Sequence, residues 1–151
     1  PEQVKVVIHP QSIVHSLVEF EDNAVLAQLG VPDMRVCIQY ALTYPERKPS
    51  EADQLNLFGK QLEFLDYDKN AFPLLDLAKS AIAKGGNIPA VMNGANEEAV
   101  ALFLDGKISF TKLFDLVIEA TEIGVQFIKE PKIDDILESD RSAREYVSSH
   151  I

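Results

Sequence analysis

The first part of the chain alternates apolar and polar residues with the two-residue period of β-strands, so we expect strand structure over residues 4–30. Between residues 13 and 20 both faces of the alternation carry apolar residues, which predicts a strand that is covered on both sides. Glu21-Asp22-Asn23 then supplies residues that tolerate left-handed backbone. A second strand follows over residues 24–29 and ends at Gly30. Together these segments predict a β-hairpin.

A helical period follows the hairpin, over residues 33–43. Pro32 suits the first turn of this helix, and Asp33 suits the positive end of its dipole. Its apolar stripe consists of Met34, Ile38, Ala41 and Leu42. Residues 45–65 contain prolines and many charged residues and predict a linker or irregular segment.

The last part of the chain, residues 66–151, predicts a helical bundle. Proline and serine mark the expected helix starts, and glycine marks several of the ends. The expected helices cover residues 73–84, 89 or 90 to about 105, 110 or 111 to 124, 134–137 and 140–147, with Ser109 and Asp140 as N-terminal caps.

The predicted hairpin supplies only two strands, which is few for a stable sheet. A lone two-stranded sheet is marginal in water, so we expect the hairpin to join a larger sheet. The chain offers few other strands, and the rest of that sheet would come from missing sequence or from another subunit. The chain also lacks an initiator Met and reaches strand-like sequence within a few residues. We therefore expect a fragment of a longer polypeptide.

Composition and charge narrow the class of protein. The chain has 151 residues, of which 46% are hydrophobic, so it is globular and not disordered. Its net charge of −10 argues against partners such as nucleic acid and anionic membranes. No apolar run has membrane-spanning length. Because Cys37 is the only cysteine, neither an internal disulfide nor a cysteine-type zinc site is expected, and a reducing, cytoplasm-like compartment is the default.

Most catalytic and binding motifs are absent. No glycine-rich phosphate loop, nucleophile elbow or metal-binding histidine pair on a helix can be found. The carboxylate pairs Glu97-Glu98 and Asp134-Asp135 are interpreted as residues of helix first turns, where negative charge meets the positive end of the dipole.

Two histidines stand in the apolar stretch VIHPQSIVHSLVEF. His9 precedes a proline and is expected to be extended, and His15 is expected to share a strand face with Ile13 and Leu17. A buried histidine is commonly a hydrogen-bonded structural residue, but a polar group placed in an apolar run also suits a functional site. Both interpretations stay open on the pattern alone. Asn93 and Asn96 share a helix face and are interpreted as hydrogen-bonding residues.

Four segments resemble the 1-deoxy-D-xylulose 5-phosphate reductoisomerase family: IHPQSIVHSLVEF, VLAQLGVPDMRVCIQYALTYPER, LEFLDYDKNAFPLLDLA and NGANEEAVALFLDGKISF. The resemblance covers nearly the whole chain and keeps the order of the segments. Two departures are Asn23, where the family often has Gly, and Gly94, where it often has Ala. Asn tolerates the turn geometry, and Gly94 costs helix propensity of about 1 kcal/mol.

The resemblance implies a position within a larger enzyme. That enzyme has an N-terminal NADPH-binding domain, a central catalytic domain and a C-terminal helical domain. It converts 1-deoxy-D-xylulose 5-phosphate to 2-C-methyl-D-erythritol 4-phosphate with NADPH and Mg²⁺, Mn²⁺ or Co²⁺, in the non-mevalonate isoprenoid pathway. The chain then corresponds to an α+β fragment. Residues 1–44 are the C-terminal part of an α/β catalytic domain and form a β-hairpin and a helix. Residues 45–65 are a linker or irregular segment, and residues 66–151 form the C-terminal helical domain.

The resemblance also assigns roles to residues. His15 matches a histidine that supports activity from the surroundings of the site, and His9 matches a structural one. Pro32 and Met34 match a segment near the nicotinamide side of the pocket, where they would form part of an apolar wall. The dinucleotide fingerprint, the acidic metal ligands and the phosphate-contact segment lie upstream in the family. No metal ligand is therefore expected in this chain, neither NADPH nor metal is expected to bind it alone, and the isolated chain is expected to be inactive.

Three further expectations concern assembly and rival functions. The family forms homodimers through its central sheet, so we expect a homodimer that pairs through the hairpin strands. The rival interpretation is a non-catalytic oligomerisation or scaffolding module derived from the same enzyme. A weaker rival is an independent helical binding domain.

Overall fold

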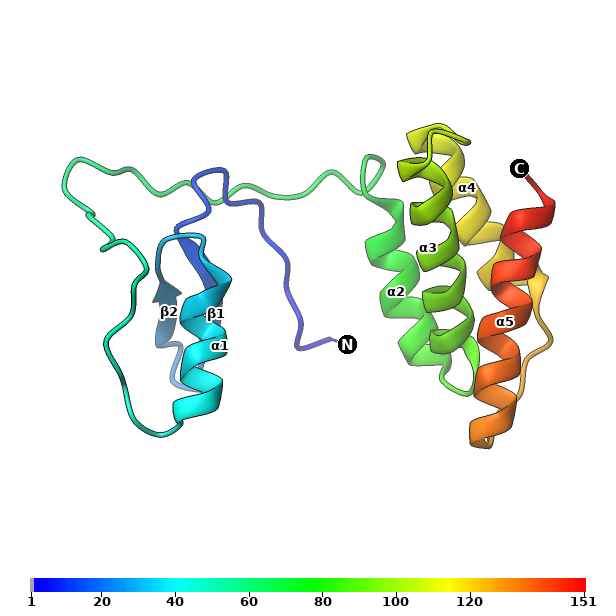
Figure 1. Ribbon diagram of the computed structural model, residues 1–151, viewed down its shortest axis with the longest axis horizontal. Coiled ribbons are helices and arrows are strands. Elements are labelled where there is room, and N and C mark those ends of the chain that lie inside the picture. The colour runs from blue at the N-terminus through cyan, green and yellow to red at the C-terminus, as the bar shows by residue number, and fades with distance from the viewer. Residues whose placement is uncertain (1) are drawn as a thin grey trace. The chain divides into compact units, whose positions relative to one another are not determined.

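The computed structural model describes residues 2–151 and divides them into two compact units. The hairpin unit spans Val6–Tyr67, and the helical unit spans Asp68–Ile151 together with the residues up to Lys5. Figure 1 shows the elements of each unit.

The hairpin unit contains the predicted β-hairpin and helix. Strands β1 (Val14–Glu19) and β2 (Val25–Leu29) pair antiparallel in a two-stranded sheet. Asn23 in the turn adopts φ 66°, the left-handed conformation that an Asn side chain tolerates. Helix α1 (Met34–Thr43) follows and is capped by Asp33, whose side chain accepts a hydrogen bond from the backbone N–H of Arg35. The expected elements are confirmed, except that Pro32 precedes the cap instead of lying in the first helical turn.

The expected strand before residue 10 is wrong. Among the described residues before residue 10, only Ile8 pairs with another backbone. It exchanges two hydrogen bonds of 2.9 Å with Leu65 as an isolated antiparallel bridge. Alternation shows which face a strand would bury, but a strand also needs a neighbouring backbone to pair with. Within residues 2–151, Leu65 is the partner found for this segment, and residues 45–64 contain no helix or strand.

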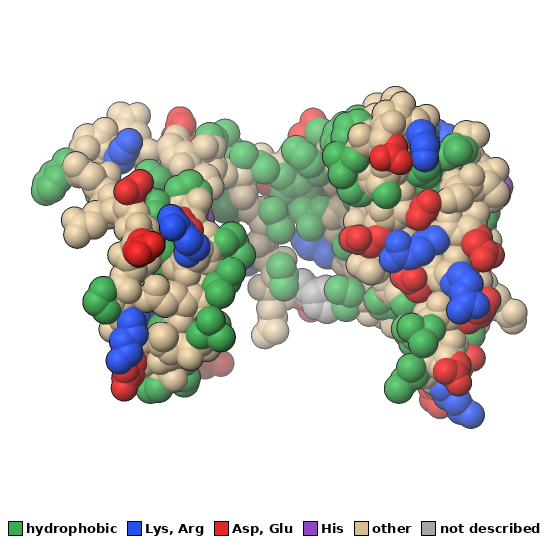
Figure 2. Space-filling model, in the orientation of Figure 1, with side chains coloured by type: hydrophobic (Ala, Val, Ile, Leu, Met, Phe, Trp, Pro, Cys, Tyr) green, Lys and Arg blue, Asp and Glu red, His purple; other side chains and the backbone are tan. Residues whose placement is uncertain are grey.

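The hairpin unit has almost no core of its own. Within Val6–Tyr67, Ile13 is the one buried residue, at 8% exposure. Large hydrophobic side chains stand on its surface (Figure 2). They include Leu17, Val18, Phe20, Val25, Leu26, Met34, Ile38 and Leu42. A two-stranded sheet with so much exposed apolar surface requires further polypeptide to cover it.

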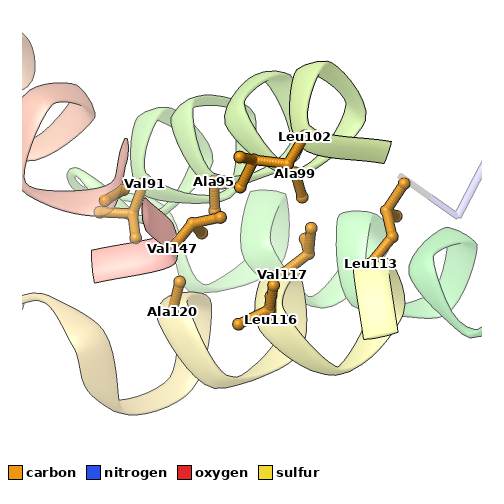
Figure 3. Close-up of a cluster of buried hydrophobic side chains, with 10 residues drawn as sticks. Val91, Ala95, Ala99, Leu102, Leu113, Leu116, Val117, Ala120 and Val147 are labelled. Atoms are coloured by element: carbon orange, nitrogen blue, oxygen red, sulfur yellow. The ribbon is translucent and has the colours of Figure 1, made fainter. Parts of the chain in front are cut away.

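The helical unit has a closed core. It consists of α2 (Pro73–Lys84), α3 (Ile88–Leu104), α4 (Phe110–Glu119), the π-helical turn η1 (Ala120–Gly124) and α5 (Ile133–Ser149). Side chains from α3, α4, η1 and α5 meet in one buried cluster (Figure 3). The cluster is formed by Val91, Ala95, Ala99, Leu102, Leu113, Leu116, Val117, Ala120, Ala143 and Val147. The first three predicted helices are confirmed to within two residues at their starts, and Ser109 caps α4 by accepting from the N–H of Lys112 at 3.2 Å.

The predicted break in the last helical segment is wrong. Helix α5 runs without interruption, and Asp140 lies inside it instead of capping a separate helix. Asp140, the predicted cap, and the neighbouring Ser139 are both hydrogen-bonded within the helix. Ser139 Oγ donates to the carbonyl of Asp135 at 2.6 Å, and Asp140 accepts from Arg144 Nε at 2.8 Å. A polar residue whose partner lies one turn away on the same helix has no reason to end it.

The two carboxylate pairs differ in position. Asp134 and Asp135 lie in the first turn of α5, as predicted. Glu97 and Glu98 do not lie in a first turn, because α3 already begins at Ile88. Glu98 instead accepts a hydrogen bond of 2.6 Å from Ser148 Oγ on α5. None of the helices within residues 2–151 is long and apolar enough to cross a membrane.

Candidate functional site

His15 lies at an irregularity of the hairpin. Val14 pairs with Leu29 and Ser16 pairs with Gln28, so the register shifts by one residue between them and His15 is the extra residue of a β-bulge. The simple alternation that grouped His15 with its neighbours along the strand is therefore interrupted at this residue. A bulge re-aims the side chain it carries and is common beside functional sites.

The His15 imidazole reaches the loop that connects β2 to α1. Its Nε2 atom lies 3.4 Å from the carbonyl oxygen of Val31. A Cβ added to Gly30 would lie 3.7 Å from the same Nε2, so the ring passes beside this glycine. The Gly30 N–H donates to the carbonyl of Ile13 at 3.0 Å, which fixes the loop against the start of β1.

Pro32 and Met34 follow directly on this loop. The connection from His15 to them runs through the Val31 carbonyl, one residue before Pro32. Met34 opens α1, and its side chain is 71% exposed. Its carbonyl accepts from Cys37 Sγ at 3.1 Å. The structure thus places the three predicted site residues along one stretch of the hairpin unit; their roles stay predictions.

The start of α1 is held by an ion pair between Asp33 and Arg35 that the sequence pattern did not predict. Arg35 Nε donates to both carboxylate oxygens of Asp33 at 3.0 Å, and a terminal guanidinium nitrogen lies 2.6 Å from Oδ2. These side-chain hydrogen bonds, and then the bond from the Arg35 backbone N–H, lower the pKa of Asp33, and the same contact raises the pKa of Arg35. An Asp cap followed two residues later by Arg was the available signal in the sequence.

A second cluster holds the segment before β1. His9 Nδ1 donates to the carbonyl of Glu63 at 2.7 Å, and its ring stacks on Phe64 with centroids 4.9 Å apart. Gln11 Nε2 donates to Glu63 Oε2 at 2.7 Å, and the Glu63 N–H donates to Gln11 Oε1 at 3.2 Å. We call His9, Gln11, Glu63 and Phe64 the clamp. No local sequence pattern predicts the clamp, because its partners lie more than fifty residues apart.

The clamp leads directly into strained backbone. Ser12, the residue after Gln11, has φ 49°, which is unusual for a residue other than glycine. Its N–H donates to the carbonyl of His9 at 3.1 Å. Left-handed non-glycine residues persist where the surroundings hold them, and they concentrate at functional sites. The sequence HPQSIVH therefore joins an anchored segment, a strained residue and the bulged His15.

The described residues do not supply a metal site. Within residues 2–151 no group of three or more His, Cys, Asp or Glu side chains is placed to hold a metal ion.

Comparison with known proteins identifies the class of this protein. The model of the DXP reductoisomerase C-terminal domain matches residues 29–146. The chain belongs to this family.

Individual relatives agree with the family match. The chain is 50% identical over 147 residues to the 1-deoxy-D-xylulose 5-phosphate reductoisomerase of Agathobacter rectalis, covering 97% of the chain and 38% of that relative. It is 49% identical over 146 residues to the enzyme of the same name from Phocaeicola vulgatus, covering 95% of the chain and 38% of the relative. The chain thus spans a little over a third of the length of these relatives.

Solved structures give the same result. The Zymomonas mobilis 1-deoxy-D-xylulose 5-phosphate reductoisomerase in complex with NADPH matches with a TM-score of 0.84 and 39% identity, covering 95% of this chain and 38% of that one. A DOX-P reductoisomerase in complex with NADPH, fosmidomycin and magnesium matches with a TM-score of 0.86 and 38% identity, covering 95% of this chain and 37% of that one. The predicted family and the α+β fold class are confirmed.

Proposed function

We propose that this chain is the C-terminal part of an NADPH- and divalent-metal-dependent reductoisomerase. That enzyme would convert 1-deoxy-D-xylulose 5-phosphate to 2-C-methyl-D-erythritol 4-phosphate in the non-mevalonate isoprenoid pathway, in the cytoplasm. The observation that carries the proposal is the 50% identity over 97% of the chain to a protein of that name. Related structures that hold NADPH and magnesium support the choice of cofactors.

Within this proposal the hairpin unit contributes to the catalytic pocket. Pro32 and the exposed Met34 would form part of an apolar wall beside the nicotinamide, where excluding water protects hydride transfer. His15 would support the site from the bulge, oriented by the Val31 carbonyl. NADPH would supply the hydride. The metal ligands and the phosphate contacts would come from polypeptide outside this chain.

The proposed enzyme would be a homodimer that pairs through the hairpin strands. The sheet has only two strands, so each strand has one edge without a neighbour in the sheet. An apolar strand edge of this kind recruits another strand.

A chimaera tests the proposal. In it, this chain replaces the matching C-terminal part of the Agathobacter rectalis relative, and NADPH oxidation is followed with 1-deoxy-D-xylulose 5-phosphate and Mn²⁺. We expect the chimaera to be active and the isolated 151-residue chain to show no rate above the no-enzyme control. A folded chimaera without activity would contradict the proposed function, and turnover by the isolated chain would contradict the division of roles.

The second candidate is a non-catalytic oligomerisation or scaffolding module. The observation that favours it is the apolar surface of the hairpin unit, which suits assembly as well as catalysis. A chimaera that folds and assembles like the Agathobacter rectalis enzyme but lacks activity would support this candidate.

A further inference from the structure

One polar atom of the clamp has no partner. His9 Nε2 is shielded from solvent and makes no hydrogen bond to any residue that the structure describes. Among the buried side-chain nitrogen and oxygen atoms of residues 2–151, it is the one for which this holds. A shielded polar atom without a partner costs free energy, and such atoms are rare in complete proteins.

The other contacts of the ring determine what Nε2 can do. Nδ1 faces the carbonyl oxygen of Glu63 at 2.7 Å, and a carbonyl only accepts, so Nδ1 carries the proton. In a neutral imidazole with its proton on Nδ1, Nε2 presents a lone pair and accepts a hydrogen bond. The ring stacks on Phe64 with an interplanar angle of 15°. The partner that matches the neutral ring is therefore an N–H or O–H donor.

The position of His9 suggests where the donor comes from. The hairpin unit buries only Ile13, so most of its surface needs cover from other polypeptide. The Agathobacter rectalis relative has such polypeptide, because the chain matches only 38% of it. We propose that His9 is a positioning residue whose Nε2 accepts a hydrogen bond from an N–H or O–H group in the part of the enzyme outside this chain.

This bond would orient the site. His9 is joined through Gln11 to the strained Ser12, and three residues later the chain reaches the bulged His15. A bond on one side to Glu63 and on the other to the rest of the enzyme would fix the entry of β1 relative to groups that this chain lacks. The effect on catalysis rests on the proposed function; the hydrogen bond itself does not.

Two substitutions of His9 distinguish the hydrogen bond at Nδ1 from the hydrogen bond at Nε2. In His9→Asn the introduced amide would reach the position of Nδ1 only, so this substitution keeps the bond to Glu63 and loses the acceptor at Nε2. The longer side chain of His9→Gln places an amide at the Nε2 position and loses the bond to Glu63. Gln11→Leu is the control, because it removes both Gln11 bonds to Glu63 and leaves the His9 ring unchanged.

In the chimaera we expect His9→Asn to lower kcat about tenfold, while KM for the substrate stays within about twofold. The lost hydrogen bond would misplace the site without removing a contact to the substrate. His9→Gln should retain more of kcat than His9→Asn. Gln11→Leu should change the melting temperature more than kcat. An order reversed between His9→Asn and His9→Gln would show that only the bond to Glu63 matters and would overturn the proposal.

A measurement on the unsubstituted sequence decides the case if a variant does not fold. Segmental ¹⁵N-histidine labelling of this part, which contains three histidines, reports the imidazole nitrogens directly. We expect the Nε2 signal of His9 to differ between the two samples, and to move in the direction of an accepted hydrogen bond in the chimaera. The same Nε2 shift in both would overturn the proposal. If the unsubstituted chimaera is inactive, the proposed function fails, but this measurement still tests the bond.

Discussion

Gly94 of α3 lies directly against the backbone of Asp140 of α5. A Cβ placed on Gly94 would come within 2.7 Å of Asp140 Oδ1, 2.8 Å of its carbonyl oxygen and 3.1 Å of its Cα. Two of these three atoms belong to the backbone and cannot move unless α5 moves. The glycine costs helix propensity, but it permits a close approach of α3 and α5, two helices that contribute to the core.

We therefore expect Gly94→Ala to destabilise the chain, although alanine is the better helix former. The propensity gain is about 1 kcal/mol, whereas overpacking against a backbone costs about 1–3 kcal/mol. The net loss of unfolding free energy should be up to about 2 kcal/mol, measured by urea denaturation followed by helical circular dichroism.

Asn93→Ala is the matched control on the same helix. Asn93 is exposed, so the substitution changes helix propensity and little else. It should raise the unfolding free energy by a few tenths of a kcal/mol. If Gly94→Ala stabilises as Asn93→Ala does, the close approach of the two helices is not what selects the glycine.

Asn87 is the polar centre of the helical unit. It is fully buried, donates through Nδ2 to Gln126 O and Ser139 Oγ at 2.9 Å each, and accepts from the Ile128 N–H at 2.8 Å. Asn87→Ala removes these three hydrogen bonds and should lower the unfolding free energy by about 2–4 kcal/mol in the same urea experiment. Asn70→Ala, at an exposed position, should change it by less than about 0.5 kcal/mol. Equal effects would show that the network is dispensable.

The Asp33–Arg35 pair predicts a pH dependence at the start of α1. Because hydrogen bonds from Arg35 lower the pKa of Asp33 in the folded state, the cap is complete above the pKa that Asp33 has in the unfolded chain. Its contribution is lost as the pH falls through the folded pKa. Carboxyl ¹³C titration should place the Asp33 midpoint below the usual range for aspartate, and Arg35→Met should raise it. An unchanged midpoint in Arg35→Met would disprove the role of the ion pair.

The hairpin predicts self-association. Val18 and Leu26 face each other across β1 and β2 and are 53% and 64% exposed. We expect the chain to form dimers or larger assemblies at tens of micromolar, and Val18→Lys or Leu26→Lys to weaken them, because a charge on an apolar strand resists pairing. Light scattering gives the mass. Association should strengthen with salt, since salt screens the repulsion between chains of net charge −10.

Glu119→Lys is the control for assembly. Glu119 is an exposed residue of α4, and its substitution adds positive charge, as either hairpin substitution does. It should leave the assembly intact. A monomeric mass for the unsubstituted chain at moderate salt would refute association through the hairpin.

We expect substitution of His15 to affect activity more than stability. In the chimaera, we expect His15→Gln to lower kcat/KM about tenfold or more while the melting temperature changes by only a few degrees, because the residue sits exposed at a bulge and not in a core. Steady-state rates and thermal melts are measured on the same samples. Lost stability with normal kinetics would instead identify a structural histidine.

The sequence by itself determined the elements whose signals are local. Local signals of this kind are the turn with Asn23, the start of α1 beside Asp33, the start of α2 at Pro73 and the Ser109 cap. The resemblance of four long segments likewise determined the family, which the family match confirmed. These features need no knowledge of distant contacts.

Only the tertiary structure decided features that depend on partners far along the chain. The bulge at His15 arises from pairing with β2, the clamp joins His9 to Glu63, and α5 continues through Asp140 while its backbone packs against Gly94. The expected strand before residue 10 failed for the same reason, because Ile8 pairs only with Leu65. Hydrophobic period and capping describe what a segment can form alone, whereas register, close approach and hydrogen bonding across the fold are set by which backbone lies beside it.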